Sequence, residues 1–242
     1  KMSGWTAPKD VILYLAGHLT VSGGTNSTIE YFGPGAHSIS CTGKATITNM
    51  GAELGATTSI FPYDERMARY LSATDREDLA QLANENKDLL TPDQEVVDDP
   101  ESYFDVLVKI DLSALEPHVV GPHSPDRARP LSQLAHEVDD ESNDFIDNVS
   151  ATLIGSCTNS SYEDMSRAAD VANQAITQGA RAKVPLMVTP GSERVRATIE
   201  RDGQMESLRS IGATVLANAC GPCIGQWKRS QNDSTKPNSI VT

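Results

Sequence analysis

The sequence lacks any apolar run that approaches the roughly 18 residues of a membrane-spanning helix, which argues against a membrane span. It is also poor in basic residues, with 20 Lys and Arg against 33 Asp and Glu and a net charge of −13. Because phosphate binding needs a basic face, this charge argues against nucleic acid as the main partner. Only four cysteines occur in 242 residues, too few for a disulfide-stapled secreted module, so we expect thiols available for metal or redox chemistry.

The length and the placement of proline predict two domains. A chain of 242 residues suits one large domain or two small ones. Residues 113–130 contain four prolines, and we expect an extended linker there. We therefore predict an α/β domain over residues 1–112 and a second α/β domain over residues 131–242. The expected fold class is α/β, with a small, mostly parallel sheet flanked by helices in each domain.

Two stretches of the first domain have a readable pattern. Residues 38–54 are rich in small side chains and predict a helix whose backbone packs closely against a neighbour. Asn49 and Glu53 would lie one turn apart on the same face of that helix. The alternation over Tyr103–Leu112 predicts a strand.

The second domain has a sharper pattern of alternating strands and helices. Apolar runs predict three strands, and helical periodicity predicts two helices between them, Tyr162–Ile176 and Glu193–Leu208. The strands are expected at Ala151–Ile154, Val184–Val188 and Thr214–Ala217. Because βαβ crossovers are right-handed, the three strands should be parallel. Their carboxyl ends then lie on one edge of the sheet, where open α/β sheets bind ligands.

Three of the four cysteines follow these strands. Cys157 comes after the first strand, and Cys220 and Cys223 come after the third. Three thiolates on one polar edge favour a soft metal centre. A [4Fe–4S] cluster held by three cysteines leaves one iron open to water or substrate. Two alternatives stay open: structural zinc, for which Cys41 of the other domain would be the fourth ligand, and a redox pair formed by Cys220 and Cys223.

Longer motifs around these residues resemble one family. The resemblance runs along nearly the whole chain and is carried by Ser3–Asp10, Asn49–Glu53, Leu153–Met165, Val188–Glu193, Arg196–Gly203 and Leu216–Trp227. In these segments the chain resembles the aconitase family, and it is most similar to the mitochondrial type. The two domains would correspond to the second and third domains of that family, both incomplete.

The resemblance implies a hydro-lyase that interconverts citrate and isocitrate through cis-aconitate on an open-iron [4Fe–4S] cluster. Cys157, Cys220 and Cys223 match the ligands of that cluster, and Ser156 and Asn218 flank them as candidates for hydrogen bonds to its sulfur. Glu53 and Asn49 match active-site residues, with Glu53 placed to manage the proton of the departing hydroxyl.

The resemblance also implies partners and a location. The substrate would be a small tricarboxylate, and the remainder of the same enzyme, an N-terminal segment and a C-terminal swivelling domain, would supply further catalytic residues. We expect these 242 residues alone to be inactive for that reason. The family's mitochondrial type implies the mitochondrial matrix.

Some residues depart from the family pattern and leave alternatives open. Lys44 stands where the family usually has an apolar residue, and Lys228 stands where an aspartate usually follows Trp227. These departures suggest a divergent, fungal-like paralogue acting on homocitrate or homoaconitate. A non-catalytic fragment that holds no cluster is a further alternative. The net charge weakens a bifunctional role in RNA binding.

Overall fold

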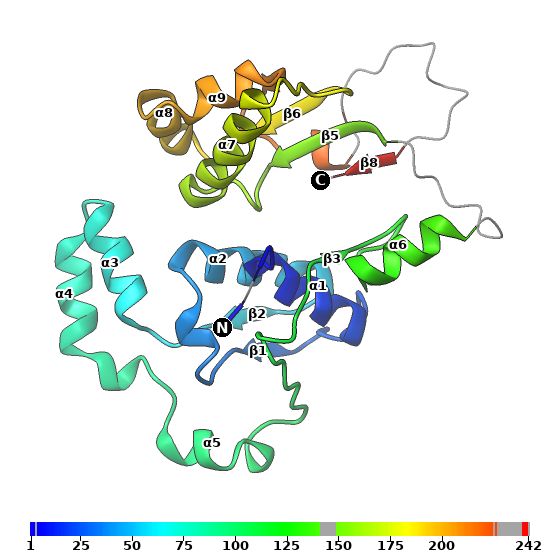
Figure 1. Ribbon diagram of the computed structural model, residues 1–242. Helices are drawn as coiled ribbons and strands as arrows, with labels where there is room; N and C mark the ends of the chain where they lie inside the picture. Colours follow the sequence, from blue (N-terminus) through cyan, green and yellow to red (C-terminus); the bar gives the residue numbers. More distant parts are fainter. Residues whose placement is uncertain (3, 141–148, 225, 227–238, 242) are drawn as a thin grey trace. The chain divides into compact units, whose positions relative to one another are not determined.

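The structure is a computed structural model that describes residues 1–2, 4–140, 149–224, 226 and 239–241 (Figure 1). The chain forms two compact units, Lys1–Leu134 and Ala135–Thr242. Each unit combines helices with a small sheet that contains parallel strands, which confirms the predicted α/β class. Trp227 and Lys228 lie outside the described residues.

The first unit contains two small two-stranded sheets among several helices. Strand β1 (Thr28–Glu30) pairs in parallel with β2 (Thr58–Ile60), and β3 (His118–Val119) pairs antiparallel with β4 (Arg129–Pro130). The helices are α1 (Pro8–Leu19), α2 (Cys41–Asn49), α3 (Glu65–Ala73), α4 (Glu77–Glu85), α5 (Gln94–Asp98) and α6 (Leu131–Asp139), with 3-10 turns η1 (Ala36–Ser38), η2 (Met50–Leu54), η3 (Lys87–Leu89) and η4 (Pro100–Ser102).

The core of the first unit lies around α1. This helix begins with Pro8, whose missing N–H is not needed in a first turn, and it buries one apolar face. Its buried partners come from Ile39 before α2, from α2, from the 3-10 turn after it and from residues 112–115. The cluster consists of Val11, Ile12, Leu15, Ala16, Ile39, Ile47, Leu54, Leu112 and Leu115.

The small-residue stretch predicted as one helix is divided into η1, α2 and η2. Helix α2 ends at Asn49, and the chain tightens into η2, which carries Glu53. The expected close packing is present. A Cβ on Gly43 would lie 2.6 Å from Pro8 Cγ, and one on Gly51 would lie 2.5 Å from Ser59 Oγ. The small residues therefore let the backbone of α2 and η2 approach its neighbours.

The proline-containing segment 113–130 packs on the first unit instead of extending between two domains. Leu115 is buried, and its carbonyl accepts a hydrogen bond from Thr6 Oγ1 at 2.8 Å. The N–H of His118 donates to Asp10 Oδ1, also at 2.8 Å. Because these contacts join residues more than 100 positions apart, local composition could not predict them.

The strand predicted at Tyr103–Leu112 was wrong, since these residues follow an irregular path.

The second unit contains a four-stranded parallel sheet with the order β7-β6-β5-β8. The predicted β-α-β-α-β pattern is confirmed, and β8 adds a strand beside β5. Gly203, with φ of 95°, divides the second predicted helix in two. The elements are β5 (Val149–Gly155), α7 (Tyr162–Thr177), β6 (Leu186–Thr189), α8 (Glu193–Arg201), α9 (Gln204–Ser210), β7 (Ala213–Val215), η5 (Pro222–Ile224) and β8 (Ser239–Val241).

Neighbouring residues of β5 and β6 belong to two separate apolar clusters. Ile154 and Val188 pack with the buried side chains of α7, α8 and α9, which lie together in Figure 1. Leu153 and Met187 belong to a smaller cluster that also contacts Cys223. Because successive side chains of a strand point to opposite faces, the helices cover one face and the cysteine turn lies against the other.

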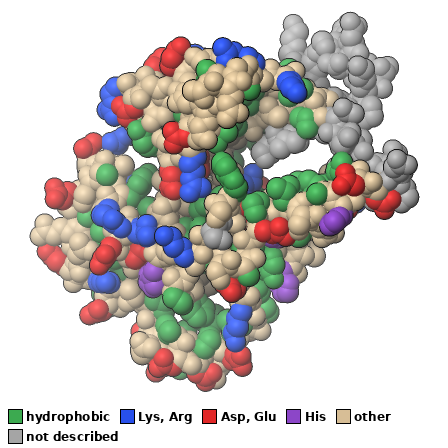
Figure 2. All heavy atoms as spheres, viewed as in Figure 1, with side chains coloured by type: hydrophobic (Ala, Val, Ile, Leu, Met, Phe, Trp, Pro, Cys, Tyr) green, Lys and Arg blue, Asp and Glu red, His purple; other side chains and the backbone are tan. Residues whose placement is uncertain are grey.

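The visible surface is mixed in charge. In Figure 2, acidic and basic side chains are interspersed over the described part of the chain. None of the helices formed by the described residues combines the length and apolarity needed to cross a bilayer.

Candidate functional site at the carboxyl edge of the parallel sheet

The loop after β5 has a constrained backbone immediately before Cys157. Gly155 has φ of 95°, and a Cβ there would lie 2.1 Å from the Thr189 carbonyl oxygen. Ser156 follows with φ of 113°, a conformation that is rare for a residue with a side chain, and its N–H donates to the same oxygen at 3.1 Å. Such strain persists only where surrounding structure imposes it, and it is common at functional sites. Cys157 itself is exposed.

The turn after β7 carries the other two cysteines. Cys220 is exposed, whereas Cys223 is half-buried and packs on the small cluster beneath β5 and β6. The Ser156 hydroxyl donates to Cys223 Sγ at 3.3 Å, across 67 positions of sequence. The Cys223 thiol in turn donates to the Cys220 carbonyl at 2.8 Å. The two cysteine-bearing loops therefore touch, as the parallel topology predicted.

The turn between β6 and α8 lies beside both loops. The N–H of Gly191 donates to the Ser160 carbonyl at 3.0 Å. The amide of Asn218 faces the same turn from the β7 side. In one orientation its nitrogen donates to Glu193 Oε2 at 3.4 Å. In the other its nitrogen donates to the Pro190 carbonyl at 2.9 Å and its oxygen accepts from Glu193 N at 2.8 Å. The second orientation satisfies both polar atoms of the amide.

Helix α7 begins directly after the first cysteine loop and fixes its far end. Ser161 is the N-cap residue, and its hydroxyl accepts from Asp164 N at 3.2 Å. The Asp164 carboxylate reaches back to Ser161 N at 3.1 Å, which completes a capping box. Cys157 is therefore held between the constrained residues 155–156 and a well-capped helix.

The donor set at this edge has the chemistry of a soft metal site. The structure describes all four cysteines, and none is in a disulfide. Three of them follow strands of one sheet, and thiolates suit iron–sulfur clusters and other soft metals. In the described part of the chain, however, no three Cys, His, Asp or Glu side chains are grouped closely enough to hold a metal ion. The three cysteines fit such a centre by donor type and by loop position, although their described side chains are not grouped as three ligands.

Asn49 and Glu53 belong to the first unit. Asn49 is the last residue of α2, and Glu53 lies in η2, so four positions separate them along one continuous helical segment. Both side chains are exposed. Their expected role beside the cysteines of the second unit stays a prediction.

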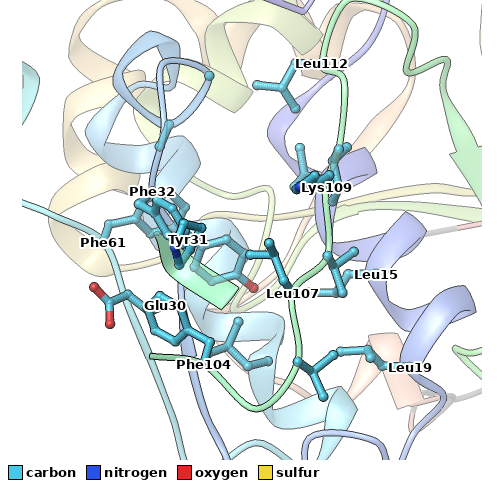
Figure 3. A pocket seen from close by; sticks show the side chains of 18 of the residues that line it. Leu15, Leu19, Glu30, Tyr31, Phe32, Phe61, Phe104, Leu107, Lys109 and Leu112 are labelled. Carbon is cyan, nitrogen blue, oxygen red and sulfur yellow. The ribbon is translucent and has the colours of Figure 1, made fainter. Parts of the chain in front are cut away.

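A large cavity in the first unit was not predicted from the sequence (Figure 3). Its volume is about 680 Å³. Aromatic and aliphatic side chains from α1, from the ends of β1 and β2 and from residues 104–112 line it, with Tyr31 and Phe61 stacked at 4.5 Å between ring centroids. Burial raises the pKa of Tyr31 to about 12, although the Ser59 hydroxyl opposes this rise. Since the lining residues are scattered over 100 positions, no local motif marks the cavity.

Comparison with known proteins connects the geometry to a family. The model of the aconitase family (aconitate hydratase) matches residues 1–242. The chain is 53% identical over 242 residues to "Aconitate hydratase, mitochondrial" of Schizosaccharomyces pombe and 54% identical over 242 residues to the protein of that name in Aspergillus fumigatus. It is 53% identical to "Probable aconitate hydratase, mitochondrial" of Caenorhabditis elegans. Each match covers 100% of this chain and 30% of the relative, so the chain spans about a third of their length.

Proposed function

The chain belongs to the aconitase family, and on that basis we propose that it forms part of a hydro-lyase that interconverts citrate and isocitrate through cis-aconitate. The names of the similar relatives support this reaction over the homocitrate alternative. Since the chain spans 30% of those relatives, the remainder of such an enzyme would supply the groups that grip the tricarboxylate. The relatives' names also support a mitochondrial location, and we place the enzyme in the matrix on the family resemblance alone.

We further propose that Cys157, Cys220 and Cys223 hold a [4Fe–4S] cluster. When bound by three thiolates, such a cluster has one iron without a protein ligand, which can act as a Lewis acid toward the substrate hydroxyl. The observation that carries this proposal is the 3.3 Å contact between Ser156 Oγ and Cys223 Sγ, because it joins the two cysteine loops across the sheet edge.

The chain's own residues have distinct roles in this proposal. A hydroxyl that donates to sulfur favours the thiolate, so Ser156 would stabilise Cys223 as a ligand. Glu53 would hold or move the proton of the departing hydroxyl, and Asn49 would bind polar groups beside it. Asn218 was expected to contact sulfur, but its described partners are Pro190 of the β6–α8 turn and Glu193 at the start of α8, which supports an indirect role.

Anaerobic reconstitution of the 242-residue chain with iron and sulfide tests the ligand assignment. We expect a brown protein whose visible absorption and bound iron are lost in Cys157→Ser, since removal of one ligand leaves only two thiolates. Cys41→Ser is the matched control, because Cys41 lies on α2 of the first unit and should leave the absorption unchanged.

The outcomes separate the proposal from its alternative. A colourless wild-type protein with native circular dichroism would support a fragment that holds no cluster. Equal iron content in Cys157→Ser and wild type would show that Cys157 is not a ligand.

A further inference from the structure

The β6–α8 turn, residues 190–192, contains no thiol, yet the sheet order places it between the two cysteine loops. Strand β6 lies between β5 and β7, so the turn that follows β6 is flanked by the turns that follow its two neighbours. Its residues follow the second predicted strand, and no role was predicted for them from the sequence. Its contacts on both sides are specific and short.

On the β5 side, the turn is in backbone contact with the loop of Cys157. Besides the hydrogen bond from Gly191 N to the Ser160 carbonyl, the Gly191 Cα approaches so closely that a Cβ would lie 2.6 Å from Ser160 Oγ and 3.0 Å from that carbonyl oxygen. Real Cβ atoms do not approach other atoms as closely as the first distance. Glycine therefore sets the separation between this turn and the loop that carries Cys157.

On the β7 side, a single side chain makes the connection. Asn218 lies two positions before Cys220, and its amide bonds to Pro190 O and Glu193 N, one group on each side of Gly191. The N–H of Leu216 donates to the Val188 carbonyl at 2.8 Å, which anchors the same segment where the two strands end. Beyond that point, the Asn218 amide holds the start of the cysteine turn to the β6–α8 turn.

We propose that the β6–α8 turn is the positioning element of the thiol site, with Gly191 setting its distance from the Cys157 loop and Asn218 tying the Cys220–Cys223 turn to it. This inference rests on the proposed cysteine site and adds the residues that fix its dimensions. A centre with three protein ligands requires sulfurs at defined separations, and groups that hold the ligands in place control its affinity. Gly191 and Asn218 are positioning residues that act through the cysteines.

Cadmium binding by the 242-residue chain tests this role without any catalytic assay. Cd²⁺ is titrated into the reduced protein while the ultraviolet absorption of the thiolate–cadmium bond is recorded. We expect Asn218→Ala and Gly191→Ala each to raise the apparent Kd about 10- to 100-fold. Asn173→Ala is the control, because Asn173 is exposed on α7 away from the loops and should leave the Kd unchanged.

A complementary substitution separates spacing from general damage. Ser160→Ala removes the oxygen nearest to the added methyl group of Gly191→Ala but leaves the Ser160 carbonyl oxygen at 3.0 Å, so the double variant should recover part of the cadmium affinity. Thermal unfolding of each variant is recorded in parallel. If Gly191→Ala reduces the folded fraction, Asn218→Ala decides the question, because its side chain is exposed and its removal leaves no internal void.

The outcomes distinguish this inference from the proposed function. Wild-type affinity in both Asn218→Ala and Gly191→Ala would overturn the positioning role and leave the ligand assignment intact. A wild-type chain that shows no thiolate–cadmium absorption would overturn the thiol site and, with it, this inference. Failure of Ser160→Ala to restore affinity to Gly191→Ala would contradict the role of the Gly191 spacing.

Discussion

Lys44 and Asp64 form an ion pair in the interior of the first unit, between Lys44 Nζ and Asp64 Oδ2, with only 3% of the Lys44 side chain and 10% of the Asp64 side chain exposed. The Lys44 ammonium also lies 5.7 Å from the centre of the Phe61 ring. Asp64 is the N-cap of α3 and accepts hydrogen bonds from the N–H groups of Arg66 and Met67, both at 3.0 Å. The pair therefore joins α2, which leads to Asn49 and Glu53, to the start of α3.

Removal of one partner of the Lys44–Asp64 pair should lower the free energy of unfolding strongly, whereas removal of both partners should lower it only slightly. Lys44→Met leaves a buried carboxylate without its cation, and we expect a loss of about 3–5 kcal/mol in the free energy of unfolding. Lys44→Met combined with Asp64→Asn removes both charges and should recover most of that loss. Urea unfolding of the three proteins measures the difference.

Lys109 provides the exposed control for this experiment. It pairs with Glu101 at 3.6 Å, and 77% and 76% of the two side chains are exposed. Lys109→Met should therefore change the free energy of unfolding by less than about 1 kcal/mol. An equal effect of Lys44→Met and Lys109→Met would contradict the importance of the buried pair.

The same pair predicts a specific dependence of stability on pH. Burial disfavours the charged form of Asp64, but hydrogen bonds from Lys44 and from the N–H groups of Met67 and Arg66 outweigh it and lower the pKa of Asp64. Because the pKa is lower in the folded state, the stabilisation is present above the ordinary aspartate pKa and is lost as pH falls through the folded value. Thermal unfolding between pH 6 and pH 3 should therefore show a steeper loss in the wild type than in Asp64→Asn, and parallel curves would contradict this.

Ser156 has a strained backbone and a hydroxyl that donates to Cys223 Sγ. Substitutions to glycine and to alanine separate the effects of these two features. Ser156→Gly relieves the strain at φ of 113° and should raise the free energy of unfolding by about 1 kcal/mol, whereas Ser156→Ala keeps the strain. Both variants lack the hydroxyl that donates to Cys223, so both should lose reconstituted iron faster than the wild type. If Ser156→Ala retains iron as well as the wild type does, the hydroxyl has no part in the site.

Gly155 and Gly203 form a matched pair of glycines, both with φ of 95°. A Cβ at Gly155 would lie 2.1 Å from the Thr189 carbonyl oxygen, whereas one at Gly203 would have nothing within 4 Å. We expect Gly203→Ala to lower the free energy of unfolding by about 1 kcal/mol, which is the penalty for its φ alone. Gly155→Ala should lower it by at least about 2 kcal/mol more, because β5 and β6 must move apart at the sheet edge to make room for the methyl group. Thermal or urea unfolding measures both losses. Equal losses in the two variants would contradict the expected clash between a Cβ at position 155 and the Thr189 carbonyl oxygen.

The sequence alone determined the βαβαβ pattern of the second unit and the placement of cysteines after its strands. These features are local, since apolar periodicity, turn residues and the right-handed crossover fix strand direction without knowledge of distant contacts. The small residues at 38–54 likewise predicted close packing, because small side chains let a helix backbone approach its neighbours.

Only the tertiary structure decided which distant residues became partners. Local composition suggested that residues 113–130 form a linker, but Leu115 and His118 are held by Thr6 and Asp10 from the opposite end of the unit. Lys44 is buried because Asp64, 20 positions away, neutralises it, and Asn218 faces the β6–α8 turn because β7 pairs beside β6. Such pairings depend on how whole elements pack, and their free energy is not encoded in the residues that adjoin them in sequence.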